Sequence, residues 1–188
     1  CSSDLKRGEM LASIVSLMKN IVIVGSHGKT TTTSLMASIF QETKIDPTII
    51  NGGIINSIKN NARLGKSDWS FLEADESDGS YVHISPTYSI ITNIDREHMD
   101  YYKSMKDLKR HFVKFTNKIP SFGKSFICSD DKINRELIKL IKNKNYYTYG
   151  QKSGSNFMIK NIKQSKSLSE FDLHVKLPNK GILNNKIS

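Results

Sequence analysis

Cysteine and long apolar runs are both scarce in this chain of 188 residues. Its two cysteines, Cys1 and Cys128, are too few for a disulfide framework, so we expect a reducing compartment, the cytoplasm. No segment approaches the ~20 consecutive apolar residues that a membrane-spanning helix needs. No charged segment followed by an apolar one opens the chain, as it does in a secretion signal. The sequence therefore argues against a disulfide-rich secreted domain and against a membrane protein.

The chain also lacks a compact basic stripe, although its net charge is +10 and its pI is near 9.5. Such a charge attracts polyanions, including nucleic acid. Its lysines and arginines are scattered, however, and are not interleaved with aromatic residues. We therefore expect a protein that handles phosphorylated ligands, and we do not expect nucleic acid as its main partner.

An initiator methionine is missing too, since the chain begins at Cys1 and its first methionine is Met10. Its last residues, Ile187 and Ser188, resemble the interior of a strand. We expect the chain to be a piece of a longer polypeptide. With 37% hydrophobic residues it can still bury one substantial core.

One stretch of the chain has the pattern of a phosphate-binding loop. An apolar run is followed by two glycines and a Lys-Thr pair: residues 21–24, Gly25, Gly28, Lys29 and Thr30. Glycines let backbone N–H groups approach phosphates, Lys29 would reach the β- and γ-phosphates, and the Thr30 hydroxyl would bind Mg²⁺. The spacing is a short form, G-x-x-G-K-T, because the first glycine of the usual G-x-x-x-x-G-K-[ST] pattern would fall on Ile23. The alternative is an ordinary glycine turn before a helix with a surface lysine.

Polar clusters follow two further apolar runs. Residues 70–72 lead into four carboxylates within six residues: Glu73, Asp75, Glu76 and Asp78. Ligands of doubly wound sheets bind at the carboxyl ends of strands, so one of these acids could complete a Mg²⁺ shell; a solvated acidic turn is the alternative. The run at 86–94 leads to His98, which is either a metal ligand, a phosphate contact or a structural residue. We interpret His83, His111 and His174 as structural or simply exposed.

Strand-like and helix-like segments alternate along the chain. This alternation predicts an α/β fold: a three-layer, P-loop-type, mostly parallel sheet flanked by helices. We expect helices at residues 5–20, 30–42, 105–118 and 131–143. We expect strands at residues 21–24, 48–50, 70–72, 86–94, 124–128 and 146–149. Segment 156–160 is a short strand candidate, and segment 170–177 alternates with a period of two; together they predict a small antiparallel β appendage on the flank. We place the boundary after Gly150, which gives a core at 1–150 and a β subdomain at 151–188.

Four motifs in the same order resemble those of the Mur ligases: residues 25–32, 51–53, 73–78 and 92–100. The likeness runs from about residue 7 to 150 and, more weakly, to the end. His27, where many relatives carry asparagine, and Ser77, where the murein-peptide ligases are expected to carry tyrosine, point to the alanine-adding branch of this family. The resemblance implies a central ATP-binding domain.

The resemblance also implies a set of site residues. The ATP phosphates would be held by Gly25, Ser26, His27, Gly28, Lys29, Thr30 and Thr31. Thr30 and Glu73 would bind one Mg²⁺, and Glu73 with His98 a second. Lys29, Glu73 and His98 would be the catalytic residues. No secure role follows for Asn51 or for the other acids.

The implied reaction is ATP-dependent amide formation in peptidoglycan precursor synthesis. UDP-N-acetylmuramate and L-alanine would be joined through an acyl phosphate, and N- and C-terminal domains of a full-length ligase would be partners of this one. The family's adenine-binding segment would follow Ser188, so we expect the chain alone to bind ATP weakly and not to catalyse ligation. The alternatives are a murein-peptide ligase of the same superfamily, a non-ligase P-loop ATPase, an inactive fragment and a nucleic-acid-binding module.

Overall fold

The computed structural model describes residues 7–41, 43–56, 58–166, 168–178 and 182–187. Its helices are α1 (Arg7–Val15), α2 (Lys29–Gln41), α3 (Met105–Thr116) and α4 (Lys132–Leu140), with a short 3-10 helix η1 (Ser80–His83). Its strands are β1 (Lys19–Val24), β2 (Thr48–Ile55), β3 (Asn60–Arg63), β4 (Trp69–Glu73), β5 (Tyr88–Ile91), β6 (Lys124–Cys128), β7 (Tyr146–Gly150), β8 (Phe157–Ser165), β9 (Leu168–Lys176) and β10 (Ile182–Ile187). Cys1 and the predicted helical residues 5, 6 and 42 lie outside the described residues.

The described strands form one sheet in the order β10-β9-β8-β7-β6-β5-β1-β4-β2-β3. Its central pairs, from β2-β4 to β7-β8, are parallel. The phosphate-loop strand β1 lies between β4 and β5, which are the strands that the acidic run and the His98 segment follow. Because all three run in the same direction, their carboxyl ends meet at one edge of the sheet.

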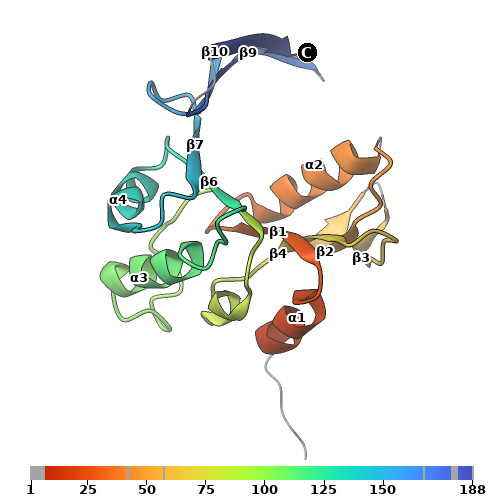
Figure 1. The fold of residues 1–188 in the computed structure, drawn as a ribbon, viewed down its shortest axis with the longest axis vertical. Coiled ribbons are helices and arrows are strands. Elements are labelled where there is room, and N and C mark those ends of the chain that lie inside the picture. Colours follow the sequence, from red (N-terminus) through yellow and green to blue (C-terminus); the bar gives the residue numbers. More distant parts are fainter. Residues whose placement is uncertain (1–6, 42, 57, 167, 179–181, 188) are drawn as a thin grey trace, which may run out of the picture.

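Apolar side chains pack on both faces of the central strands. Leu72 belongs to a large cluster with Phe112 and Phe115 of α3. Its neighbour Phe71 meets Phe40 of α2 with ring centroids 4.6 Å apart. Since successive side chains of a strand point to opposite faces, α2 covers one face, and α1, α3 and η1 cover the other (Figure 1). The predicted three-layer α/β fold is confirmed.

The predicted first helix was too long at its C-terminal end. The spacing of Leu17 and Met18 suggested a helix to residue 20, but α1 ends at Val15 and β1 begins at Lys19. Leu17 is 94% exposed, so it does not belong to a buried helix face. Asn20 is buried instead. Its side chain fixes the start of the strand: it donates to the Ser85 carbonyl and accepts from the N–H of Thr87, the residue before β5.

Replacing Asn20 with alanine is expected to lower the free energy of unfolding by about 1 kcal/mol, because it removes the acceptor of the half-buried Thr87 N–H. Urea denaturation of the chain measures this. Asn60→Ala is the control, since the Asn60 side chain is exposed and accepts from the N–H of its neighbour Asn61. Equal losses for the two variants would contradict the role given to Asn20.

The β2 region also differs from the prediction. The sequence indicated a strand at residues 48–50, whereas β2 continues through Gly52 and Gly53 to Ile55 and then pairs antiparallel with β3. Two glycines are weak strand formers, which is why the sequence pattern stopped there. The register shifts between Ile50 and Ile55, so this hairpin is irregular.

The C-terminal appendage is antiparallel, as predicted, but it extends the main sheet. Strands β8, β9 and β10 pair antiparallel with one another. β8 joins β7 through two parallel residue pairs, and the three strands project from the rest of the chain (Figure 1). The division into 1–150 and 151–188 stays a prediction. Among the described residues, none of the helices combines the length and the apolar character required to cross a bilayer.

Candidate active site

The turn between β1 and α2 is held by the segment that follows β5. Gly25 has φ 135°, and a Cβ there would lie 2.2 Å from Thr92 Oγ1, so only glycine fits. The N–H of Ser26 donates to the Asn93 carbonyl (3.0 Å), and the N–H of His27 donates to the Asn93 side chain (2.9 Å). Sequence reasoning did not assign a role to Thr92 or Asn93. Their contacts give the loop a fixed shape.

The predicted phosphate-binding residues therefore lie in one continuous loop and helix start. Gly28 is also in a left-handed conformation, with φ 81°. Thr31 lies in the first turn of α2, where backbone N–H groups point out of the helix toward the loop. A helix N-terminus preceded by a glycine turn is a favourable place for anions. The geometry fits the predicted role of residues 25–31, which stays a prediction.

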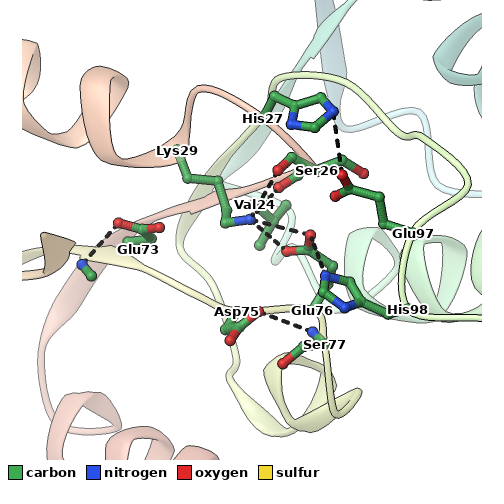
Figure 2. A network of polar contacts seen from close by, with 12 residues as sticks. Val24, Ser26, His27, Lys29, Glu73, Asp75, Glu76, Ser77, Glu97 and His98 are labelled. Atoms are coloured by element: carbon green, nitrogen blue, oxygen red, sulfur yellow. Dashed lines mark hydrogen bonds and ion pairs between the residues drawn. The ribbon is translucent and has the colours of Figure 1, made fainter. Parts of the chain in front are cut away.

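Lys29 folds back across this loop. Its ammonium donates to the Gly25 carbonyl (2.6 Å) and to the Glu76 carboxylate (2.9 Å to Oε2 and 3.2 Å to Oε1). The Lys29 side chain is 12% exposed and that of Glu76 is 2% exposed. Figure 2 shows the ammonium in the middle of the polar network, between Glu73 and Glu76.

Thr30 and Glu73 meet as the sequence predicted. The Thr30 hydroxyl donates to Glu73 Oε2 (2.9 Å), and the N–H of Gly52 donates to the same oxygen (2.8 Å). A Cβ on Gly52 would lie 3.0 Å from that oxygen, so the glycine lets β2 approach the carboxylate. This contact gives the Asn-Gly-Gly motif a structural reason that sequence reasoning missed. The hydroxyl and carboxylate oxygens converge, which is the donor chemistry that Mg²⁺ prefers.

His98 lies with Glu76 and Asp75. Its Nε2 is 3.7 Å from Glu76 Oε1, and one potential ligand atom from each of the three residues lies within 4.8 Å of the others. Glu73 lies on the other side of the Lys29 ammonium (Figure 2). Carboxylates and an imidazole can bind a divalent cation. The second ion shared by Glu73 and His98 stays a prediction.

Tyr102 connects the segment that follows β4, at Glu76, to the segment that follows β5, at His98. It is fully buried; its O–H donates to the Glu76 carbonyl (2.5 Å), and its N–H donates to the His98 carbonyl (2.9 Å). Burial raises the pKa of the Tyr102 phenol, which keeps it a donor. His98 has φ 56°, an unusual conformation for a non-glycine residue, and these contacts hold it there. No sequence motif pointed to Tyr102.

Opposing effects act on the Glu76 carboxyl. Burial raises its pKa, while the hydrogen bond and charge of Lys29 act in the opposite direction. A buried carboxylate needs a partner of this kind, because an unpaired buried charge is costly.

The remaining histidines have lesser roles. His27 is exposed, and its Nε2 lies 3.5 Å from Glu97 Oε1 at the rim of the site. His83 is exposed in η1. The Nδ1 of His111 lies 3.0 Å from the Asp107 carbonyl, and its ring packs edge-on against Tyr102. His174 is half-buried in β9, not simply exposed as predicted.

Comparison with known proteins adds an independent line of evidence. A family model described as the Mur ligase middle domain matches residues 23–187. A UDP-N-acetylmuramate–L-alanine ligase from Pelagibacter ubique (strain HTCC1062) is 71% identical over 93% of this chain. The ligase of the same name from Endomicrobium trichonymphae is 44% identical over 90% of this chain. The matches span 38% and 37% of these two relatives' lengths.

Solved structures share the fold. The UDP-N-acetylmuramate-alanine ligase from Thermotoga maritima aligns with a TM-score of 0.75 at 22% identity, covering 94% of this chain and 38% of that one. The MPL ligase from Neisseria meningitides aligns with a TM-score of 0.76 at 18% identity, covering 88% and 55%. The family model matches most of the chain, and the predicted resemblance is confirmed: this chain belongs to the Mur ligase family, and it matches the middle domain of that family.

Proposed function

We propose that this chain is the ATP-binding part of a cytoplasmic ligase that joins L-alanine to UDP-N-acetylmuramate in peptidoglycan precursor synthesis. The observation that carries the proposal is the convergence of Lys29, Thr30 and Glu73 at the carboxyl ends of adjacent strands. The name of the relative with 71% identity supports the choice of substrates. The domains that would hold the uridine, the adenine and the amino acid are expected partners of this one.

In this proposal the residues of the chain bind and orient the phosphates. The N–H groups of Gly28 and Lys29 would face the phosphates, since those of Ser26 and His27 donate to Asn93. The Lys29 ammonium would offset the phosphate charge at the β- and γ-positions. Thr30, Glu73 and His98 would hold Mg²⁺, which when bound supplies positive charge between two anions that repel each other, the substrate carboxylate and ATP. A carboxylate oxygen of the muramoyl group attacks the γ-phosphorus of ATP, and ADP leaves. The alanine amine then attacks the carbonyl of the acyl phosphate, loses a proton and forms the amide as phosphate leaves.

A chimaeric ligase tests this function. The chain replaces the matching segment of the Pelagibacter ubique relative, so that the flanking domains are supplied. We expect phosphate release that depends on both L-alanine and UDP-N-acetylmuramate, whereas the 188-residue chain alone gives none.

Two results would contradict the proposal. The first is a folded chimaera that binds UDP-N-acetylmuramate but does not ligate alanine to it. The second is a folded chimaera that releases phosphate from ATP equally well without L-alanine and UDP-N-acetylmuramate, which would favour the non-ligase P-loop ATPase alternative. Ligation by the isolated chain would contradict the expectation that it is inactive alone.

A further inference from the structure

The Lys29 ammonium has no donor to spare. A lysine ammonium has three N–H groups. Here it lies 2.6 Å from the Gly25 carbonyl, 3.4 Å from the Ser26 carbonyl and 2.9 Å from the Glu76 carboxylate. A phosphate can gain a full contact with this ammonium only by displacing one of these acceptors.

Glu76 is the acceptor that carries charge, and it is held firmly. Its residue is 1% exposed, and its backbone carbonyl accepts from the buried Tyr102 phenol. Its carboxylate contacts Lys29 through both oxygens. A phosphate chain that reaches Lys29 therefore comes close to a buried negative charge, which repels it in a region of low dielectric.

We infer that Glu76 is an internal counter-ion of Lys29 that competes with phosphates and makes the loop selective for nucleotide carrying a divalent cation. This inference rests on the proposed function. A metal-free nucleotide meets the Glu76 charge with nothing to offset it. A metal-loaded nucleotide brings positive charge with its phosphates, so the same carboxylate costs it less. Glu76 is thus a positioning residue that acts through Lys29.

The dissociation constants of ADP, measured in the chimaeric ligase by calorimetry with Mg²⁺ and with EDTA, test the inference. In Glu76→Gln, metal-free ADP is expected to bind about tenfold more tightly, because one close negative charge is removed. Binding of Mg-ADP is expected to change much less, so the preference for metal-loaded nucleotide falls. Asp68→Asn is the control, since it removes an equal charge from an exposed carboxylate that pairs with Lys19, away from the loop. The affinity of this variant for metal-free ADP is expected to stay near that of the wild type.

One further variant keeps the test decisive. If Glu76→Gln does not fold, Glu76→Asp replaces it. Aspartate keeps the charge but is one methylene shorter, so it loses part of the contact with Nζ, and a smaller tightening of metal-free ADP is expected.

The possible results distinguish a failure of this inference from a failure of the proposed function. Unchanged or weaker metal-free binding in Glu76→Gln overturns the inference, as does a loss confined to Mg-ADP, which would make Glu76 a metal ligand instead. An equal effect of Asp68→Asn would overturn it too, because the negative charge would then act without the Lys29 contact. A wild-type chimaera that binds no nucleotide under either condition overturns the proposed function together with this inference.

Discussion

Replacing Lys29 with methionine is expected to abolish measurable ligation by the chimaeric enzyme. Losing a single donor to a developing oxyanion costs about 10²–10³-fold in rate, and Lys29 carries a full charge as well. The structural basis is the position of the ammonium, which lies inside the loop within 2.6 Å of the Gly25 carbonyl. Steady-state phosphate release at saturating ATP measures the loss.

The same substitution is expected to destabilise the fold, because Glu76 would keep a buried charge without a partner. Removing one member of a buried ion pair typically costs about 3–5 kcal/mol. The double variant Lys29→Met/Glu76→Gln removes the orphaned charge, so it should recover most of the stability in urea denaturation. It should recover none of the ligase activity. A double variant that regained activity would show that Lys29 acts only through stability.

Replacing Glu73 with glutamine is expected to remove the Mg²⁺ dependence of nucleotide binding and to lower the ligation rate by about 10²–10³-fold, comparable to the loss of one charge-stabilising group. The amide keeps the shape of the side chain, and its oxygen can still accept from the Gly52 N–H, so the fold should survive. What is lost is the negative oxygen beside the Thr30 hydroxyl.

The control for Glu73 lies at the other end of the same strand. Asp68 directly precedes β4, and its exposed carboxylate pairs with Lys19. Asp68→Asn removes an equal charge far from the loop, so magnesium titrations of nucleotide binding should match those of the wild type. If Glu73→Gln also kept the wild-type magnesium dependence, Glu73 would not be a metal ligand.

Parallel strands alone place the acids after β4 and the polar segment after β5 beside the loop, whereas the choice of Glu73 and His98 as metal ligands came from the resemblance to the Mur ligases. Thr30 follows β1 and Glu73 ends β4, and adjacent parallel strands bring such residues together without any knowledge of side-chain packing. The same rule places His98, after β5, near the loop. The fold class followed equally well, because buried parallel strands contain continuous apolar runs, and the run at residues 21–24 in β1 is easy to recognise.

The remaining features depend on contacts that have no local signature. Glu76 was one of four acids, and nothing in its spacing distinguished the carboxylate that turns inward to Lys29 from those that stay near solvent. Tyr102 acts through a buried O–H on a carbonyl 26 positions earlier in the chain. The β2–β3 hairpin passes through two glycines, whose low strand propensity hid it.

A crystal structure of the chimaeric ligase with Mg²⁺ and a non-hydrolysable ATP analogue would test phosphate binding at this loop most directly. We expect the β- and γ-phosphates within hydrogen-bond distance of the Lys29 ammonium, and Mg²⁺ in contact with Thr30 Oγ1 and a Glu73 oxygen. We also expect Lys29 to have exchanged its Glu76 contact for phosphate. A triphosphate bound away from this loop, or one bound there with Thr30 and Glu73 both remote from the metal, would contradict these expectations.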